Sequence, residues 1–289
     1  MDQLALLKNL DRAASVFRSI GLSPLPSIGK RILKSLMGTA TVSINTEGFE
    51  VNGSFEHRHY LDALQRGKVE AFMVKLFRSV VQPGMVVLDI GGFVGWYTLL
   101  AAREVGPHGK VFVFEPDPRN YALLIQNLRE NGFSDRVVPV PKAVSDRIGT
   151  VSFFMHEGDQ SRSSLIPSNR EVAKTNVESI ILDEYLANEI KIDVIKMDIE
   201  GAELHALAGM ERILARADVA LKMFVECNPL SLQLAGGSAQ TLIRRLRELG
   251  FIIMIIDEQN DRLAPVDSTI ETAKYVNLYC CRRNETCPG

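Results

Sequence analysis

The 289-residue sequence lacks the features that mark several large classes of protein. Its formal net charge is only −2, so it has no excess of Lys and Arg with which a general nucleic-acid surface neutralises phosphates. No apolar run approaches the length of a bilayer span, which predicts no transmembrane segment. The N-terminus has neither a basic start nor a long apolar stretch, so it is not typical of a signal peptide. We expect a cytoplasmic protein.

Cysteine is scarce, and its positions indicate no metal site. The four cysteines are Cys227, Cys280, Cys281 and Cys287. They match no zinc-site spacing, and no histidine lies near them in the sequence. We expect reduced thiols, although Cys287 in the tail could form an adventitious disulfide.

A glycine-rich turn follows the apolar segment that begins at residue 86. The glycines of this turn are Gly91, Gly92 and Gly95. Glu115 ends the next apolar segment, 111–114. In an α/β sheet such a turn lets backbone approach a nucleoside, and a carboxylate after the next strand accepts from ribose hydroxyls. The pattern is G-G-x-x-G, and Asp89 precedes it. Both points favour S-adenosylmethionine over NAD, because S-adenosylmethionine has no pyrophosphate to hold.

Strand-like and helix-like segments alternate from residue 85 to residue 256. This alternation predicts an α/β fold with a mostly parallel sheet and helices on both faces. Residues 275–280 are predicted to form a last, antiparallel strand beside its predecessor. We therefore assign residues 69–289 to one ligand-binding domain.

Residues 1–68 form a predicted N-terminal extension. Apolar residues at helical spacing predict helices up to residue 38. Residues 39–55 alternate and contain Gly48 and Asn52-Gly53, which predicts a short hairpin, and Asn-Gly is a favoured tight turn. The extension could pack against the main domain, contact the substrate or join two copies as a homodimer.

An acidic residue ends each major predicted strand. These residues are Asp89, Glu115, Asp198 with Glu200, and Glu226. The carboxyl ends of parallel strands share one edge of a sheet, where ligands bind. A loop acid alone is explained equally well as a helix cap. Their presence at one edge favours a ligand site.

Segment 195–203 is the most distinctive in the chain. Its Lys196, Asp198, Glu200, Gly201 and Glu203 resemble the K-x-D-x-E-G-x-E signature of the FkbM-type methyltransferase family. Further motifs resemble this family in the same order: D-I-G-G-F-V-G at 89–95, Phe114-Glu115-Pro116, Ala143-Val144-Ser145-Asp146, Ser163-Ser164-Leu165 and Val225-Glu226. The resemblance covers roughly residues 67–256.

The resemblance implies a Rossmann-like class I methyltransferase with a seven-stranded sheet. It implies an O-methyltransferase of biosynthesis that uses S-adenosylmethionine on a hydroxyl of a sugar, glycolipid or secondary metabolite. One departure is Gly92-Phe93, where the family usually has Ala-Asn. The alternative function is therefore a protein of this fold that binds the cofactor or a related ligand but has lost or changed methyl transfer, for example a non-catalytic subunit.

A nucleic-acid methyltransferase is a weaker alternative. The only dense basic cluster is Arg244, Arg245 and Arg247 on one predicted helix, and such a cluster is more often a solvated face.

The predicted cofactor site takes residues from four strand ends. They are Asp89, Gly91, Gly92, Phe93, Gly95, Glu115, Asp146 and Asp198. Gly91 and Gly95 would lie against the methionine moiety, and Glu115 would bind the ribose. Asp146 or the neighbouring backbone would face the adenine, and Asp198 the cofactor's ammonium group.

The predicted catalytic residues are Asp198, Glu200, Glu226 and His156. Methyl transfer needs a base that removes the acceptor's proton. The choice among them stays open, and His205 is more readily explained as a helix-surface histidine. Clustered carboxylates also suit Mg²⁺. A Mg²⁺ site and purely structural acids are both open, and no metal ligand is assigned.

Overall fold

The computed structural model describes residues 41–156, 163–167, 171–186, 190–218 and 220–282. The helices predicted within residues 1–38 lie outside these ranges. The chain divides into two compact units, Met1–Val69 and Glu70–Gly289, which are described separately.

The described part of the first unit is a hairpin followed by a helix. Strands β1 (Thr41–Thr46) and β2 (Phe49–Ser54) pair antiparallel, and α3 (Arg58–Gln65) follows the short turn η1 (Phe55–His57). The hairpin is confirmed, but its turn is Glu47-Gly48 and not Asn52-Gly53. Both turn residues have positive φ, 52° and 82°, as tight hairpin turns require. Asn52 instead lies inside β2 and accepts a hydrogen bond from Ser43.

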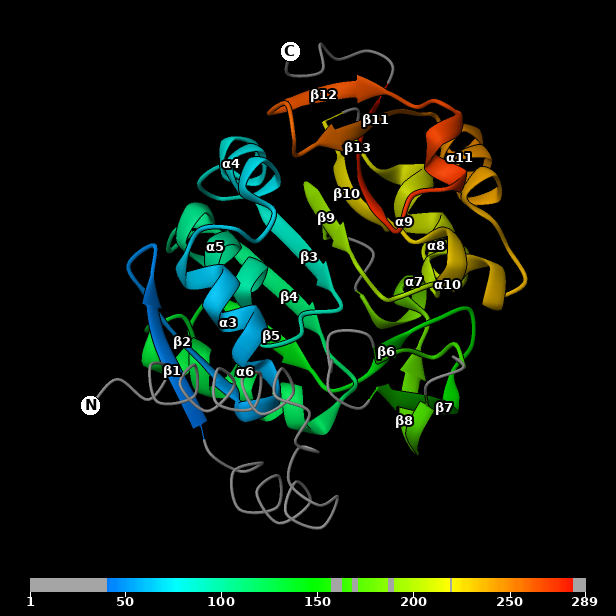
Figure 1. The fold of residues 1–289 in the computed structure, drawn as a ribbon. Helices are drawn as coiled ribbons and strands as arrows, with labels where there is room; N and C mark the ends of the chain where they lie inside the picture. Colours follow the sequence, from blue (N-terminus) through cyan, green and yellow to red (C-terminus); the bar gives the residue numbers. More distant parts are fainter. Residues whose placement is uncertain (1–40, 157–162, 168–170, 187–189, 219, 283–289) are drawn as a thin grey trace, which may run out of the picture. The chain divides into compact units, whose positions relative to one another are not determined.

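The second unit is built on an eight-stranded sheet with the order β12-β11-β13-β10-β9-β3-β4-β5 (Figure 1). Its strands are β3 (Val86–Ile90), β4 (Lys110–Phe114), β5 (Val137–Val140), β9 (Val194–Met197), β10 (Lys222–Cys227), β11 (Phe251–Asp257), β12 (Arg262–Pro265) and β13 (Val276–Arg282). From β5 to β10 neighbouring strands pair parallel. The predicted antiparallel last strand is confirmed: β13 lies between β10 and β11. The sheet has eight strands and not seven, because β12 folds back onto β11 as a short edge strand.

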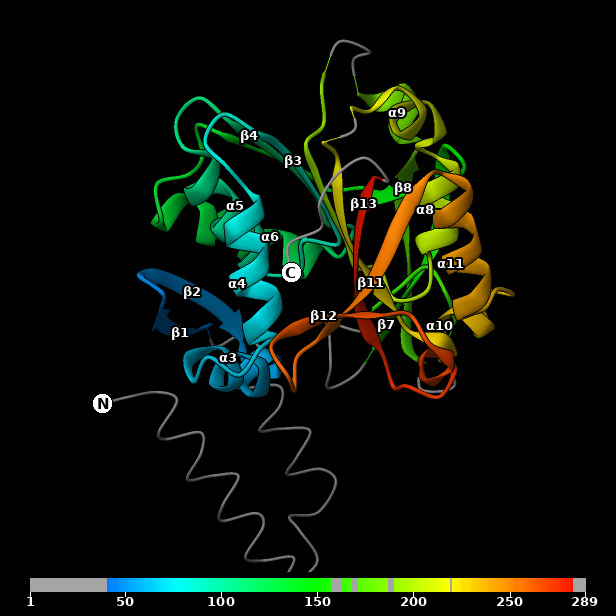
Figure 2. The same cartoon turned by 90° about the horizontal axis from the view of Figure 1, so that it is seen from above.

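Helices cover both faces of this sheet (Figure 2). One face carries α4 (Ala71–Val80), α5 (Trp96–Val105) and α6 (Pro118–Glu130). The other carries α8 (Glu203–Ala208), α9 (Glu211–Arg216) and α11 (Ala239–Glu248), with α7 (Leu182–Tyr185) packed on α9 and α10 (Pro229–Leu234) near the strand ends. Strand β3 is buried on both faces, as parallel strands between two helix layers are.

A three-stranded sheet is inserted between β5 and β9. Strand β8 (Glu171–Ile180) pairs antiparallel with β7 (Gly149–His156) and parallel with β6 (Ala143–Val144). Ser164 forms a single bridge to Phe154 of β7, which brings the 163–167 segment back to this sheet.

Cys227 and Cys280 are buried free thiols. Cys281, at the end of β13, is disulfide-bonded, so the expectation of reduced thiols is wrong for this residue. Within the described ranges, no helix is long and apolar enough to cross a membrane.

The glycine turn after β3 is tied to both neighbouring strands. The amides of Gly91 and Gly92 donate to the carbonyl oxygen of Phe114 at 2.9 and 3.1 Å. Gly91 has φ 89°, and a Cβ on it would lie 1.9 Å from the carbonyl oxygen of Asp198. The turn therefore fits against the loop after β9 only without a side chain.

We predict that Gly91→Ala destabilises the fold far more than Gly84→Ala. Both glycines have a left-handed φ, 89° and 84°, so both variants carry the conformational cost of about 1–2 kcal/mol. Only Gly91 also meets backbone, whereas a Cβ on Gly84 meets open space. Chemical denaturation should show a loss of at least about 4 kcal/mol for Gly91→Ala. Equal losses for the two variants would contradict the close approach to Asp198.

Candidate functional site

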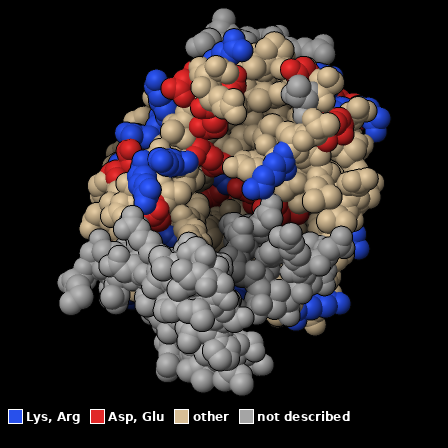
Figure 3. Space-filling model, in the orientation of Figure 1, with Lys and Arg blue, Asp and Glu red and all other residues tan. Residues whose placement is uncertain are grey.

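Polar side chains form two adjacent rows across the face of the sheet that α4 and α5 cover. Strand register pairs Asp89 with Lys196. Two residues further along the parallel strands, on the same face, register pairs Glu226 with Asn277. Asp198, which follows β9, lies beside Glu226. Figure 3 shows acidic side chains gathered in the middle of the face drawn. Of the predicted strand-end acids, Asp198 and Glu226 therefore lie side by side at one edge of the sheet.

Lys196 is the buried cation of these rows. Its ammonium group donates to Asp198 Oδ2 at 3.2 Å and lies 4.8 Å from the ring centre of Tyr97. Burial lowers the pKa of Lys196, but the carboxylates of Asp198, Asp89 and Glu70 outweigh it and raise the pKa above its usual value. The lysine therefore stays charged and offsets part of the negative charge around it.

Glu70 supplies a further, half-buried carboxylate that the sequence analysis missed. It precedes α4 with φ 46° and accepts from the hydroxyl of Tyr97 at 2.8 Å and the amide of Asn277 at 2.5 Å. Burial raises its pKa. Glu258 caps the same helix by accepting from the amides of residues 72 and 73, both at 2.9 Å. In the sequence, a glutamate before an apolar helix is explained as a helix cap. The residues around Glu70 therefore did not predict its place in the site.

Asp89 lies inside the sheet and does not reach the strand ends. It is buried, and its Oδ2 accepts from the hydroxyl of Thr98 at 2.5 Å. Burial raises its pKa, and the charge of Lys196 opposes the rise. Its contacts fix the start of α5 beside the glycine turn.

Glu115 holds the glycine turn from the side of β4. Its two carboxylate oxygens accept from the amides of Phe93 and Asp117, each at 2.8 Å. Burial raises the pKa of Glu115 to about 8, against the effect of these two hydrogen bonds. Phe93 has φ 50°, which is uncommon for a bulky residue. Since a carboxylate has about four lone-pair sites, Glu115 can accept further hydrogen bonds from a ligand.

Gly92 and Gly95 are glycines for reasons of packing. A Cβ on Gly92 would lie 2.2 Å from Val113 Cγ2, and one on Gly95 would lie 2.7 Å from Leu124 Cδ1. Gly95 also precedes α5 with φ 97°. The pattern G-G-x-x-G is thus required by the fold, and contact of these two residues with the cofactor stays a prediction.

The loop after β9 is held by its own last glutamate. Glu203 is fully buried, and its Oε1 accepts from the amides of Ile199 at 3.3 Å and Gly201 at 3.1 Å. Burial raises the pKa of Glu203 to about 7. Ser164 donates to the carbonyl oxygens of Ile199 and Glu200 at 3.1 and 2.8 Å. The acidic motif is therefore a rigid loop fixed from both sides.

Within this loop Glu200 and Asp198 have different surroundings. Glu200 has φ 51°, and its Oε2 accepts from Asn228 at 3.1 Å and Ser231 at 3.4 Å, at the start of α10. The side chain of Asp198 is 35% exposed and bonds only on one oxygen to Lys196. Asp198 is therefore the better placed of the two to meet a ligand.

Glu226 is the carboxylate at the end of β10. It is 8% exposed, and its Oε2 has no hydrogen-bond partner among the described residues. Burial, and then the nearby charges of Asp198 and Glu200, raise its pKa well above the usual value. A buried oxygen without a partner is costly unless a ligand completes it.

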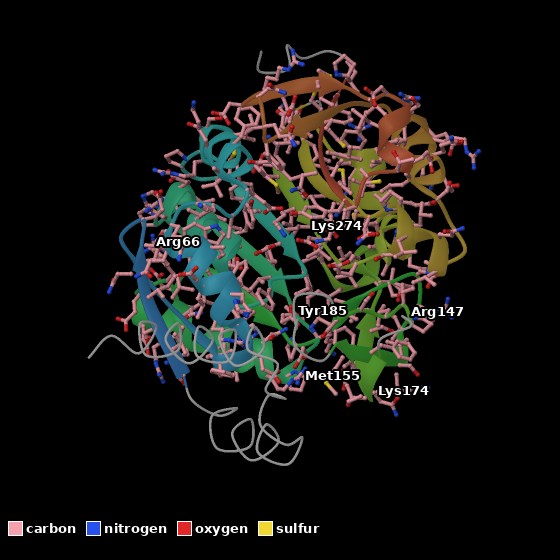
Figure 4. The ribbon with its side chains drawn as sticks, in the orientation of Figure 1. Arg66, Arg147, Met155, Lys174, Tyr185 and Lys274 are labelled. Carbon is pink, nitrogen blue, oxygen red and sulfur yellow. The ribbon has the colours of Figure 1, made fainter. Side chains whose placement is uncertain are left out.

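Two predicted residues belong to the segment of the three-stranded sheet, Asp146 between β6 and β7 and His156 at the end of β7. Asp146 is bound to Arg147 at 2.9 Å and to His205 at 3.1 Å, and Arg147 lies beside the three-stranded sheet (Figure 4). The hydrogen bond from Arg147, with a smaller effect of His205, holds the pKa of Asp146 well below its usual range. His156 ends β7, and its side chain lies outside the described part of the structure.

The carboxylates do not form a metal site. In the parts of the chain that the structure describes, no group of three or more His, Cys, Asp or Glu residues is placed to hold a metal ion. Asp198, Glu200 and Glu226 therefore do not fit the Mg²⁺ site considered from the sequence.

The fold and the site together define a class. A mostly parallel sheet, a glycine turn after β3 and an acid after β4, with further acids after β9 and at the end of β10, are the features of a Rossmann-like class I methyltransferase. Residues 89–253 match the model of the methyltransferase FkbM domain, and the chain belongs to this family. The resemblance seen in the sequence is thereby confirmed.

Individual proteins that the chain is similar to are methyltransferases. The 2-O-methyltransferase NoeI of Sinorhizobium fredii is 32% identical over 164 residues, which are 50% of this chain and 66% of that protein. The hexuronic acid methyltransferase AglP of Haloferax volcanii is 26% identical over 151 residues, 50% of this chain and 58% of that protein. A solved O-methyltransferase of Thermotoga maritima has a TM-score of 0.44 at 18% identity, covering 84% of this chain and 79% of its own. The chain thus spans only 66% and 58% of the two curated relatives.

We predict that Glu203→Gln removes part of the pH dependence of stability. The folded-state pKa of Glu203 is raised to about 7, from 4.5. The wild type therefore loses stability as pH rises from 4.5 to about 7, because only the unfolded chain ionises freely there. The variant lacks this loss, which amounts to about 3 kcal/mol.

Urea denaturation from pH 4.5 to 8 measures the effect. The control is Glu130→Gln, the same change at an exposed position of α6. Parallel curves of unfolding free energy against pH for the wild type and Glu203→Gln would contradict the raised pKa of Glu203.

Proposed function

We propose that this chain is an S-adenosylmethionine-dependent O-methyltransferase that acts on a hydroxyl of a sugar, glycolipid or secondary metabolite. The observation that carries this proposal is the meeting of three features at one sheet edge: the glycine turn, Glu115 and the half-exposed Asp198. Membership of the FkbM family and the NoeI and AglP relatives support it.

The residues present fit the cofactor's polar groups. Glu115 would accept from the ribose hydroxyls, because its carboxylate is already oriented by two backbone amides. Asp198 would accept from the ammonium group, and Lys196 holds it in place. The backbone of Gly91 would border the methionine moiety. Asp146 is committed to Arg147 and His205, so we propose that the backbone before it, rather than its carboxylate, borders the adenine.

When bound, S-adenosylmethionine supplies a methyl group on a sulfonium. The acceptor oxygen forms the new bond to the methyl carbon, the carbon–sulfur bond breaks with its electrons going to sulfur, and the hydroxyl proton must leave. We propose Glu226 as the base that takes this proton. Its Oε2 has no partner among the described residues, and a raised pKa makes a carboxylate a stronger proton acceptor. Glu200 would position the loop through Asn228.

The alternative, loss of methyl transfer, was suggested by Phe93. The amide of Phe93 still donates to Glu115, so the loop keeps its connection to the ribose acid despite the substitution. This supports the catalytic proposal. No step is assigned to Mg²⁺ or to His156. A cytoplasmic location, a homodimer and a substrate or dimer role for residues 1–68 stay predictions.

We predict that calorimetry detects S-adenosylmethionine binding and that Glu115→Ala weakens it by at least about 1.4 kcal/mol, tenfold. The loss arises because the ribose hydroxyls lose their acceptor. Asp135→Ala, an exposed acid beside β5, serves as the control and should bind like the wild type. Wild-type affinity in the Glu115 variant would contradict the ribose assignment.

We predict that Glu226→Gln and Asp198→Asn fail in different ways. Glu226→Gln should keep cofactor affinity and lose roughly 10²-fold in kcat, because the base is gone. Asp198→Asn should weaken cofactor binding by about tenfold or more. In the wild type, kcat/KM should rise with pH through the raised pKa of Glu226. An unchanged kcat in Glu226→Gln would transfer the role of base to Asp198 or a histidine.

A further inference from the structure

The acceptor side of the site follows from the order of the strands. The glycine turn and Glu115 follow β3 and β4 and face the proposed nucleoside. Strands β9, β10 and β13 continue the sheet away from them. If the proposed function is correct, the acceptor must therefore lie over the ends of β10 and β13, beyond Asp198.

Tyr275 stands at this end of the sheet. Strand register places Asn277 opposite Glu226 and Val276 opposite Cys227, so Tyr275 comes next, beside the start of the loop after β10. It is a large aromatic residue that is 44% exposed. Its ring is therefore accessible to a ligand that binds over this end of the sheet.

The surroundings of Tyr275 link it to the carboxylates. Partial burial, and then the charges of Glu70, Glu226 and Asp198, raise the pKa of its phenol. Register also brings Tyr275 within two positions of Asn277, which pairs with Glu226, so Tyr275 lies near the carboxylate whose Oε2 has no partner among the described residues. An aromatic face and a buried hydrogen-bond acceptor thus lie together.

We propose that Tyr275 and Glu226 form the acceptor subsite and that it takes the ring of a neutral or amino sugar. The apolar C–H face of the sugar packs on the ring of Tyr275, whose face is negative in its quadrupole. One sugar hydroxyl donates to Glu226 Oε2, which satisfies that oxygen. Tyr275 fixes the acceptor's position, and Glu226 touches the reacting oxygen.

The charge of the site selects against acidic sugars. Asp198 and Glu226 lie side by side here, Glu70 is bound to the neighbouring Asn277, and the buried cation Lys196 is already bound to Asp198. Lys274 precedes Tyr275 but is exposed, so water and salt screen its charge (Figure 4). A sugar carboxylate placed here would meet like charges without a buried cation of its own.

The test measures sugar binding to protein saturated with S-adenosylhomocysteine, by saturation-transfer NMR titration. The probes are the methyl glycosides of glucose, fucose, glucosamine and glucuronic acid. The variants are Tyr275→Ala, Tyr275→Phe and, as a matched control, Tyr185→Ala. Tyr185 is 42% exposed, but it contacts Phe114, which belongs to the core on the opposite face of the sheet.

We expect at least one neutral or amino glycoside to bind, and the glucuronide to bind about tenfold more weakly or less. Tyr275→Ala should weaken sugar binding by about tenfold, while Tyr275→Phe and Tyr185→Ala keep it. Affinity for S-adenosylhomocysteine should not change. Unchanged sugar binding in Tyr275→Ala, equal binding of the glucuronide, or no binding of any glycoside would overturn the proposal. Failure to bind S-adenosylhomocysteine would instead overturn the proposed function.

Discussion

The buried ammonium group of Lys196 is the interaction on which the site depends. Several carboxylates lie close together in space on one face of the sheet, and burying them without a cation would be costly. Lys196 is bound to Asp198 and lies over the ring of Tyr97. Its positive charge offsets the negative charges of Asp89 and Glu70. One strand residue thus allows the acids to be gathered where a cationic cofactor can bind them.

Much of the fold was predictable because parallel strands impose simple rules. Alternating strands and helices gave a sheet whose carboxyl ends meet, so Glu115, Asp198 and Glu226 could be assigned to one edge before any coordinates. The antiparallel last strand was also visible as a final apolar segment. The eighth strand was not, because β12 is short and only half-buried, and its pairing with β11 depends on a local turn.

The residues that the sequence could not place are those joined over long distances in the chain. Glu70 reaches Asn277 across 207 positions, and neither belongs to a motif. Asp146 has a long-range partner of the same kind: its carboxylate is bound to His205 on α8, while its contact with the cofactor stays a prediction. Lys196 carried a usable signal, since a lysine inside an apolar strand must find carboxylates.

Ser164 has a consequence for how this fold can be rearranged. Its hydroxyl bonds two carbonyl oxygens of the acidic loop, while its backbone pairs with β7 of the three-stranded sheet. Ser164 therefore connects the three-stranded sheet directly to the acidic loop. A β7–β8 segment transplanted from another family member would need its own hydroxyl at this point, or the graft would lose the link between the acidic loop and the three-stranded sheet although every residue of the loop's motif was intact.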